Sequence, residues 1–512
     1  EPEFKPILRA KAIAFENAAG RDREVLDELG NTVLYGHPDA QAILTKIQVE
    51  NDRLLILRNT VEGERPAGFV SYREIGNEDL FGVLKDMELA KLVRGKSSRE
   101  ILLITGIYAR EDGTGDSGVI RDAPQQLLVE VLAKELEKNY SFALFVAERG
   151  TATKEVVYVL ERQGFIRPHM ADENDKRTIY MVDMHEPLMF LHNLDTTIKE
   201  PFASNPAVLD AVEKNHKKLQ IAMTKLYPGN LVLSLSSGIM YHRLVDRITA
   251  LNDVPREPLV PRRLGKNMCV PFGKILRGKV VPNTVTKTLH TDKVYEPDLN
   301  SFTIEPFPYY SPLKSQIETI KSFDRPVILV DDLVHTANRL QVLVPQLRED
   351  GIPIKKVVVG VLSGYGRDLM QCLKVPVESI YSMPNLRQWF VESTLYPFIG
   401  GDTVRREEMK VAGLQPSINM ILPYATPRLS GCSREALVEF SACCIENSRD
   451  LFQVLEAEYR KMYAKNLTLS RLSEAVILPL CPDKGECVSY DPNLAASVYL
   501  ENDLEMLYRT RK

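Results

Sequence analysis

Residues 327–340 read VILVDDLVHTANRL, and the pattern predicts a buried strand, a short loop and the start of a helix. The apolar residues 327–330 lead to Asp331 and Asp332 at the carboxyl end of that strand. Ligands of open α/β sheets bind outside the carboxyl ends of strands, and loop N–H groups at a helix start favour phosphate. Carboxylates accept hydrogen bonds from a sugar diol or bind a metal. The segment therefore indicates a parallel α/β domain with a site for a ribose 5-phosphate.

This segment resembles the signature of type I phosphoribosyltransferases, which is an apolar strand, Asp-Asp or Asp-Glu, and a Thr/Gly-containing loop. The resemblance implies that Asp331 and Asp332 hold the ribose hydroxyls of phosphoribosyl pyrophosphate, and that Mg²⁺ accompanies the pyrophosphate. It also implies a loop around the 5-phosphate, formed by His335, Thr336, Ala337, Asn338 and Arg339. Ala337 stands where the family usually has glycine, and Arg339 where it usually has serine or threonine. The alternative is a capped strand–helix turn with solvated acids.

A second apolar strand is expected at residues 231–235, followed by Ser236, Ser237 and Gly238. In phosphoribosyltransferases the first strand ends in a small-residue loop that meets pyrophosphate, so the resemblance implies this role for the three residues. The family has a mobile, often basic catalytic loop between the two motifs. The basic residues of this interval are Lys274, Arg277, Lys279, Lys287 and Lys293, and the sequence does not single one out.

Residues 50–185 show a different order of elements: two strands, a long insertion, a buried strand, a glycine loop, a helix, a strand, a helix and a strand. This order resembles the GNAT acetyltransferases. Residues 66–72 look like the third strand of that family, and residues 102–108 with the helix at 125–136 look like its fourth strand and cofactor helix. The resemblance implies an acyl-CoA whose pyrophosphate binds at the helix start. The residues implied in this contact are Arg121, Asp122, Ala123 and Gln125.

The length of 512 residues predicts two to four domains. The boundaries are expected at 1–195 for the GNAT-like mixed sheet, 196–400 for the phosphoribosyltransferase-like parallel sheet, and 401–512 for a mostly helical extension. In the extension, helical patterns cover 434–463 and 466–476. The fold class is thus a multidomain α/β protein with a helical C-terminal part.

Composition excludes several classes of protein. The 65 basic and 69 acidic residues give a formal net charge of −4 and no field that attracts nucleic acid or an anionic membrane. No apolar run reaches membrane-span length, and no signal-peptide pattern opens the chain. Seven cysteines without a CxxC spacing predict reduced thiols, no metal site and a cytoplasmic protein. Because the chain lacks an initiator Met, the sequence leaves open whether a further domain precedes it.

The sequence therefore predicts a transferase of nucleotide-type metabolism with a phosphoribosyl pyrophosphate or ribose phosphate site and an acyl-CoA site. Acetyl-CoA and Mg²⁺ are the expected cofactors, small phosphate-bearing molecules the expected partners, and a homo-oligomer is left open. No catalytic residue is assigned. The alternative is a non-catalytic or regulatory scaffold in which both folds survive and the sites have lost their chemistry.

Overall fold

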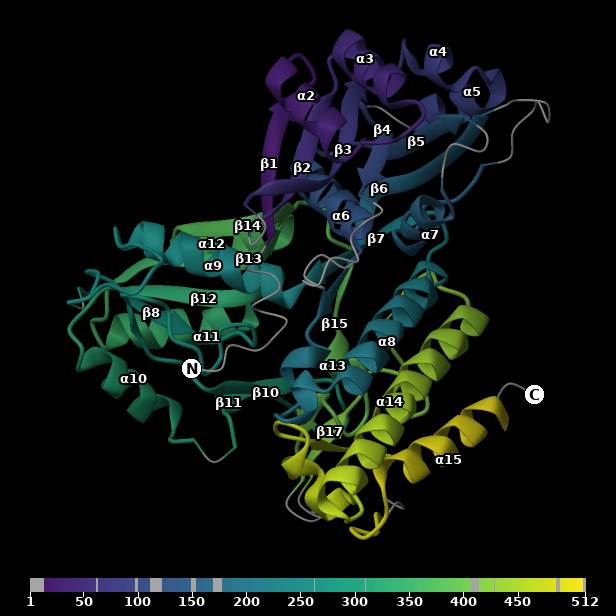
Figure 1. Ribbon diagram of the computed structural model, residues 1–512. Coiled ribbons are helices and arrows are strands. Elements are labelled where there is room, and N and C mark those ends of the chain that lie inside the picture. Colours follow the sequence, from purple (N-terminus) through teal and green to yellow (C-terminus); the bar gives the residue numbers. More distant parts are fainter. Residues whose placement is uncertain are drawn as a thin grey trace.

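The computed structural model describes residues 13–60, 63–96, 100–110, 122–148, 153–168, 177–261, 263–308, 310–406, 414–427, 429–484 and 489–509. Three sheets and their helices make up this part of the chain (Figure 1). Arg121 lies outside these ranges. The described cysteines are free thiols. Among the described helices, none combines the length and the apolar character that crossing a membrane requires.

The first sheet is mixed and has eight strands. They are β1 (Ile13–Ala19), β2 (Arg53–Asn59), β3 (Arg65–Ile75), β4 (Ile101–Ala109), β5 (Phe142–Glu148), β6 (Arg177–His192), β7 (Asn230–Ser236) and β15 (Gln388–Val391). Side chains alternate between its two faces, so Leu54 and Ile56 pack in one cluster while Leu55 and Leu57 pack in another. The outer face is covered by α2 (Arg23–Asn31), α3 (Ala40–Glu50), α4 (Leu80–Leu84) and α5 (Met87–Lys96).

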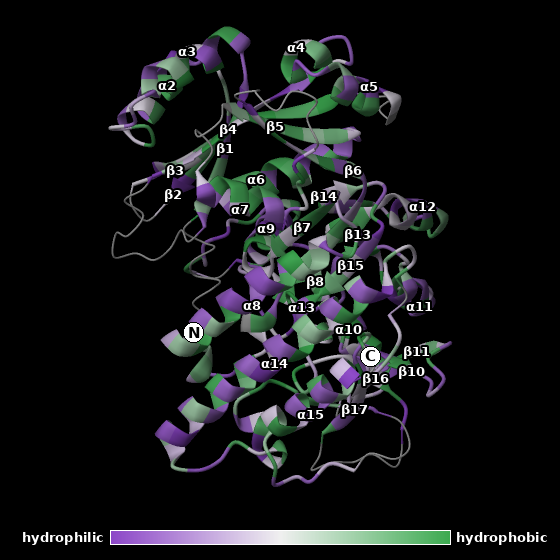
Figure 2. Cartoon of the chain, turned by 90° about the vertical axis from the view of Figure 1, so that its right-hand side faces the viewer, coloured by the Kyte–Doolittle hydropathy of each residue, from purple (hydrophilic) through white to green (hydrophobic). Residues whose placement is uncertain are grey.

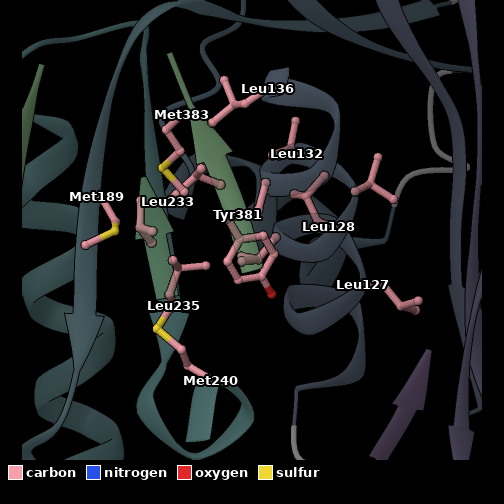
Figure 3. Packing of buried hydrophobic residues seen from close by; sticks show 14 of the residues in the cluster. Leu127, Leu128, Leu132, Leu136, Met189, Leu233, Leu235, Met240, Tyr381 and Met383 are labelled. Atoms are coloured by element: carbon pink, nitrogen blue, oxygen red, sulfur yellow. The ribbon is translucent and has the colours of Figure 1, made fainter. Parts of the chain in front are cut away.

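The opposite face of the first sheet carries α6 (Ala123–Glu135) and α7 (Lys154–Arg162). Most of α6 is buried, because it packs against β2, β3 and β4 on one side and against the second sheet on the other. Figure 2 shows this helix as largely hydrophobic in the interior of the molecule. Leu128 and Leu132 share one apolar cluster with Tyr381 and Met383 of the second sheet (Figure 3). The two sheets therefore share a core.

The second sheet is wholly parallel, as expected from the strand–helix–strand order, with strands in the order β14-β13-β12-β8-β9. These are β8 (Met268–Pro271), β9 (Val285–Thr286), β12 (Val327–Val334), β13 (Ile354–Ser363) and β14 (Val377–Met383). Helix α9 (Ser237–Leu251) packs on one face, and α10 (Leu313–Lys321) and α11 (Asn338–Glu349) pack on the other. Helix α12 (Gly364–Cys372) follows β13.

The strand at 231–235 does not begin this second sheet, so that expectation is wrong. As β7, it pairs in parallel with the second half of β6, and β15 pairs with the same stretch of β6. A strand that is apolar on both faces suits either sheet, so its sequence could not decide between them. The first sheet thus takes strands from both sides of the boundary expected at residue 195.

The remaining elements form a small third sheet and a helical layer. The sheet has the order β11 (Phe302–Pro306), β10 (Thr291–Tyr295), β16 (Asp402–Val404), β17 (Gln415–Ile418), β18 (Leu480–Pro482). The layer contains α8 (Pro206–Thr224), α14 (Arg434–Tyr463) and α15 (Ala496–Arg509), which lie side by side in Figure 1. The helix predicted over 434–463 is confirmed, and the Ser433 hydroxyl caps it by accepting from the Ala436 N–H. Residues 466–476 contain only a 3₁₀ turn, Leu469–Glu474.

Candidate functional site

Strand β8 ends beside the middle of β12, because the two strands pair in parallel up to Pro271 and Val330. Strand β12 continues to Val334, so Asp331 and Asp332 lie within it and not after its end as expected. The chain after β8 therefore meets the two aspartates of β12. The Asp332 carboxylate accepts the N–H of Lys274 at 2.7 Å and the N–H of Ile275 at 3.0 Å. At the first candidate functional site, two backbone hydrogen bonds thus hold the β8 loop against Asp332.

Glycine at position 273 permits this close approach. A Cβ at Gly273 would lie 2.5 Å from Asp332 Oδ1, 2.7 Å from Asp331 Oδ1 and 2.8 Å from the Asp332 backbone nitrogen. No real side chain fits at such distances without moving the strand or the loop. The loop after β8 thus approaches the two aspartates closely, whereas Ser236, Ser237 and Gly238 follow β7.

Three cationic side chains are electrostatically coupled at this edge of the sheet: Lys274, Arg277 and Arg339. Burial and the nearby Arg339 guanidinium lower the pKa of Arg277, and burial lowers the pKa of Lys274 although Asp402 opposes it. The Arg339 guanidinium also donates to the Phe272 carbonyl at 3.4 Å, across from its own helix. The positive charges lower one another's pKa values, while the carboxylates of Asp292, Asp332 and Asp402 oppose this, so the site holds charges of both signs.

The acidic groups of the site are strongly perturbed as well. Burial raises the pKa of Asp331 to about 7, with Arg339 opposing and Asp332 reinforcing the shift. Asp331 also accepts the Asp332 N–H at 2.8 Å. Burial raises the pKa of Asp402 on β16, although Lys293 and Lys274 oppose this. At neutral pH Asp331 is therefore poised between its charged and neutral forms, as a ligand-binding carboxyl often is.

Aromatic rings flank the cationic cluster. The His290 ring stacks on Tyr310 with centroids 3.7 Å apart and planes inclined by 17°. Arg277 lies over the Phe307 ring at 5.1 Å from its centroid. Burial, followed by the charges of Arg277 and Lys287, lowers the pKa of His290, which favours a neutral ring. The partly exposed rings of His290, Phe307 and Tyr310 beside cations could stack against a planar ligand group such as a nucleobase.

The loop predicted to hold the 5-phosphate lies between β12 and α11. Its His335 Nδ1 is 2.9 Å from Ser363 Oγ, and the Asn338 amide donates to Thr336 Oγ1 at 2.8 Å. Ala337 has a φ of 50°, in the left-handed region that glycine adopts more easily. Of the predicted set, the structure thus brings Asp331, Asp332 and Arg339 together with the β8 loop, and leaves the rest of the loop bonded to its own neighbours.

Ser236, Ser237 and Gly238 lie at the carboxyl end of β7 in the first sheet, where α9 begins. Ser236 caps α9, since its hydroxyl accepts the Ile239 N–H at 3.4 Å. The structure does not record these residues in contact with Asp331 or Asp332. The sequence analysis named Lys274 and Arg277 among five basic residues and could not single either of them out. Their position next to Asp332 follows from the pairing of β8 with β12.

The residues predicted to bind acyl-CoA lie at the start of α6. Asp122 has a φ of 60° and its carboxylate pairs with the buried Arg162 instead of capping the helix. Ala123 is buried, and Gln125 is 9% exposed. The buried Gln125 Oε1 has no hydrogen-bond partner among the described residues. An acceptor left in this state costs stability, unless a ligand supplies a donor.

Next to this helix start, β4 and β5 separate. They pair only over residues 102–104 and 143–145, although both strands continue. Thr105 is skipped in the pairing of β4 with β3 and forms a bulge there, fixed by donation from its hydroxyl to Asp52 Oδ2 at 2.5 Å. A bulge bends its strand, so the facing edges beyond it diverge. Beyond residues 104 and 145, no backbone hydrogen bonds pair the described parts of β4 and β5. Their facing N–H and C=O groups could therefore bind a ligand that has amide groups of its own.

No protein-family model matches the chain, and no curated protein matches its sequence. Solved structures of GNAT acetyltransferases are similar to the first third of the chain. A GNAT-family acetyltransferase described as putative, from Desulfovibrio desulfuricans, is 12% identical over 34% of this chain and 99% of its own, with a TM-score of 0.25. A GNAT acetyltransferase of Listeria monocytogenes is 16% identical over 33% and 94%, with a TM-score of 0.23.

A third solved structure is the catalytic domain of a Tetrahymena histone acetyltransferase in complex with coenzyme A. It is 10% identical over 33% of this chain and 92% of its own, with a TM-score of 0.22. At such identities and TM-scores, the function has to be argued from the residues of this chain. Any function of the second sheet likewise has to be argued from its own topology and contacts.

Proposed function

We propose that the edge of the second sheet binds a phosphorylated ribose, with phosphoribosyl pyrophosphate as the ligand, and that the protein transfers the phosphoribosyl group. One observation supports this above all. Lys274, Arg277 and Arg339 act on one another electrostatically beyond the carboxyl end of β8, next to Asp331 and Asp332 of β12. Cations suit the phosphates and carboxylates suit the ribose hydroxyls, so both parts of such a ligand find their counterparts.

Each group has a role that follows from its position. Asp332 is engaged by two N–H groups of the β8 loop, so Asp331 is the carboxylate with more capacity for a diol. Lys274 and Arg277, on that loop, would face the pyrophosphate, and Arg339 the 5-phosphate. When the bond to ribose breaks, negative charge develops on the departing pyrophosphate, and fixed cations stabilise it. Mg²⁺ bound to the pyrophosphate, with Asp331 as the nearby carboxylate, would add Lewis-acid stabilisation.

Thermal melting of the whole protein tests ligand binding. Phosphoribosyl pyrophosphate with Mg²⁺ at about a hundredfold over its Kd should add about 2.7 kcal/mol of stability. The melting temperature should then rise by several degrees. Lys274→Met and Arg277→Met each remove a charge at similar volume and should abolish most of this rise.

Lys279→Met is the matched control, because Lys279 lies over the Tyr241 ring at 4.5 Å from its centroid. This variant should keep the full rise in melting temperature. Absence of any rise in the unmodified protein contradicts the proposal. A rise without release of pyrophosphate in the presence of nucleobases contradicts the transfer step and leaves a ligand-binding scaffold.

The divergence of β4 and β5 favours a second ligand, and we propose that it is an acyl-CoA. The two amides of its pantetheine arm match the unpaired strand edges, and its pyrophosphate suits the N–H groups at the start of α6. In this proposal the orphaned Gln125 Oε1 accepts a hydrogen bond from the ligand. An acyl-CoA site would make the first sheet a transferase unit as well.

Melting with acetyl-CoA tests this second site. Gln125→Leu should weaken acetyl-CoA binding about tenfold while keeping or raising the stability of the free protein, because it removes a buried acceptor without a partner. Gln163→Leu is the matched control, since its amide is equally buried and unpartnered but lies at the end of α7. Equal loss of binding in both variants, or no acetyl-CoA shift at all, contradicts the site.

A further inference from the structure

Two histidines and a glutamate meet where β6 and β15 end. They are His192, His216 and Glu392, and one potential ligand atom from each lies within 4.8 Å of the other two. Glu392 Oε2 is 2.7 Å from His216 Nε2 and 4.0 Å from His192 Nδ1. The imidazole centroids are 4.2 Å apart. This cluster lies outside the two sites described above and none of its members is used there.

The fold explains why residues so distant in sequence converge. Strands β6 and β15 run parallel, with Val391 opposite Leu191, so the next residues, His192 at the end of β6 and Glu392 after β15, lie side by side. The third ligand, His216, comes from α8, which packs against β7 on the other side of β6. Carboxyl ends of parallel strands are a common place for ligand sites.

Further residues orient the three side chains. The Gln220 amide nitrogen lies 3.2 Å from His192 Nε2, and Ser234 Oγ also contacts this nitrogen, which leaves His192 Nδ1 toward Glu392. The Tyr396 hydroxyl donates to Glu392 Oε1 at 3.3 Å, so Oε2 is directed at the histidines. Such outer hydrogen bonds fix the ring orientation of metal-binding histidines and the rotamers of metal-binding carboxylates.

The Glu392 carboxylate of the cluster is buried and faces the two imidazoles. The Glu392 side chain is fully buried. His192 Nδ1 is buried without a hydrogen-bond partner in the part of the chain described, and Glu392 Oε2 faces His216 Nε2 at 2.7 Å. A buried carboxylate needs a compensating positive charge, and a divalent ion supplies one.

We propose that His192, His216 and Glu392 bind one Zn²⁺ ion. Two imidazoles and a carboxylate are a ligand set that zinc accepts, with a fourth position left for water or a small ligand. Tetrahedral coordination at about 2.0–2.1 Å places ligand atoms about 3.4 Å apart. The observed 2.7 Å and 4.0 Å separations bracket this value, so small side-chain rotations would complete the site. The ion would join β6, β15 and α8.

Metal content and melting of the full chain test the proposal. After dialysis against a chelator, the protein should take up one equivalent of Zn²⁺, measured by elemental analysis, and its melting temperature should rise by several degrees. Co²⁺ in place of Zn²⁺ should give the strong visible absorption of a four-coordinate ion. His216→Gln and Glu392→Gln should lower the Zn²⁺ content at least tenfold and abolish the rise.

His185→Ala is the matched control, because His185 also pairs with a carboxylate, Asp183, at 2.8 Å, but no third ligand joins them among the residues that the structure describes. It should keep one equivalent. Glu392→Gln should melt within a few degrees of the chelated unmodified protein, which separates loss of the ion from loss of the fold. Failure of the chelated unmodified protein to take up Zn²⁺ overturns the proposal, and so does full Zn²⁺ content in both ligand variants.

Discussion

The Glu130 carboxylate of α6 lies 2.8 Å from the Arg243 guanidinium of α9. Tyr381 of β14 donates its hydroxyl proton to the same carboxylate at 2.8 Å, and Arg243 donates to the Tyr381 oxygen at 2.6 Å. Burial opposes ionisation of Glu130, but Arg243 and Lys134 prevail and lower its pKa. This charged network lies within the apolar core that the two sheets share and fixes how they face each other.

Glu130→Ala should therefore cost about 3–5 kcal/mol of unfolding free energy, because it leaves Arg243 in a low-dielectric environment without its partner. Urea unfolding measures this. Lys134→Met removes only the exposed partner of Glu130 and should cost less than about 1 kcal/mol. The double variant Glu130→Leu/Arg243→Met should recover most of the loss. Equal effects of the two single variants would contradict a network centred on Arg243.

Gly273→Ala should disturb the contact between the β8 loop and Asp332, on which the proposed phosphate site depends. The added methyl group would meet Asp332 Oδ1 at 2.5 Å and the Asp332 backbone nitrogen at 2.8 Å. Overpacking of this kind costs about 1–3 kcal/mol, and it displaces the loop that carries Lys274. We expect lower stability by urea unfolding and weaker binding of phosphoribosyl pyrophosphate. Gly95→Ala in α5, where nothing lies within 4 Å, should instead stabilise the protein by about 0.5–1 kcal/mol.

Ala337→Gly should stabilise the protein by about 1 kcal/mol. Ala337 has a φ of 50° at the start of α11, and the left-handed region costs an L-residue roughly 1–2 kcal/mol that glycine avoids. The gain is reduced by the greater chain entropy of glycine when unfolded. Ala457→Gly, in the exposed interior of α14, should destabilise by about 1 kcal/mol in the same urea experiment. A loss of unfolding free energy in both variants would contradict strain at Ala337.

The sequence predicted the parts of the molecule whose signals are local. Strand β12 and its aspartates form one contiguous segment, and α14 has a capping serine and an unbroken helical period, so both elements were predicted, although β12 continues through the aspartates to Val334. The partners of Asp332 were missed because β8 has only four residues and its pairing with β12 is long-range. The small-residue loop after β7 gave a stronger local signal, although β7 belongs to the other sheet.

The His192, His216 and Glu392 cluster could not be predicted for a related reason. The sequence led us to expect no metal site because no Cys or His spacing typical of one appears. Here each ligand comes from a different element, and only the parallel pairing of β6 with β15 brings two of them together. Similarly, Glu130 had no partner identifiable from sequence, because Arg243 and Tyr381 follow far along the chain.

Asp331 should make the stability of the free protein depend on pH. Its pKa is about 7 when folded and 3.8 as an ordinary aspartate, so between these values the folded protein binds more protons than the unfolded chain. The contribution of Asp331 is therefore fully present below pH 3.8 and is lost as the pH rises through 7. Asp331→Asn cannot ionise, so it should gain stability relative to the unmodified protein as the pH rises. Because Asp331 is only partly buried, we expect a gain of about 1–2 kcal/mol at pH 8 and little at pH 4.

Urea unfolding at pH 4, 6 and 8 measures this difference. Asp324→Asn, which changes an exposed loop carboxylate before β12, should alter stability by less than about 0.5 kcal/mol at each pH. Phosphoribosyl pyrophosphate with Mg²⁺ should reverse the order at pH 8, because the ionised Asp331 then has ligand hydroxyls and a cation to bind. Asp331→Asn could instead be less stable than the unmodified protein at pH 8 without ligand. In that case Arg339 already stabilises the Asp331 carboxylate in the free protein, which contradicts the predicted pH dependence.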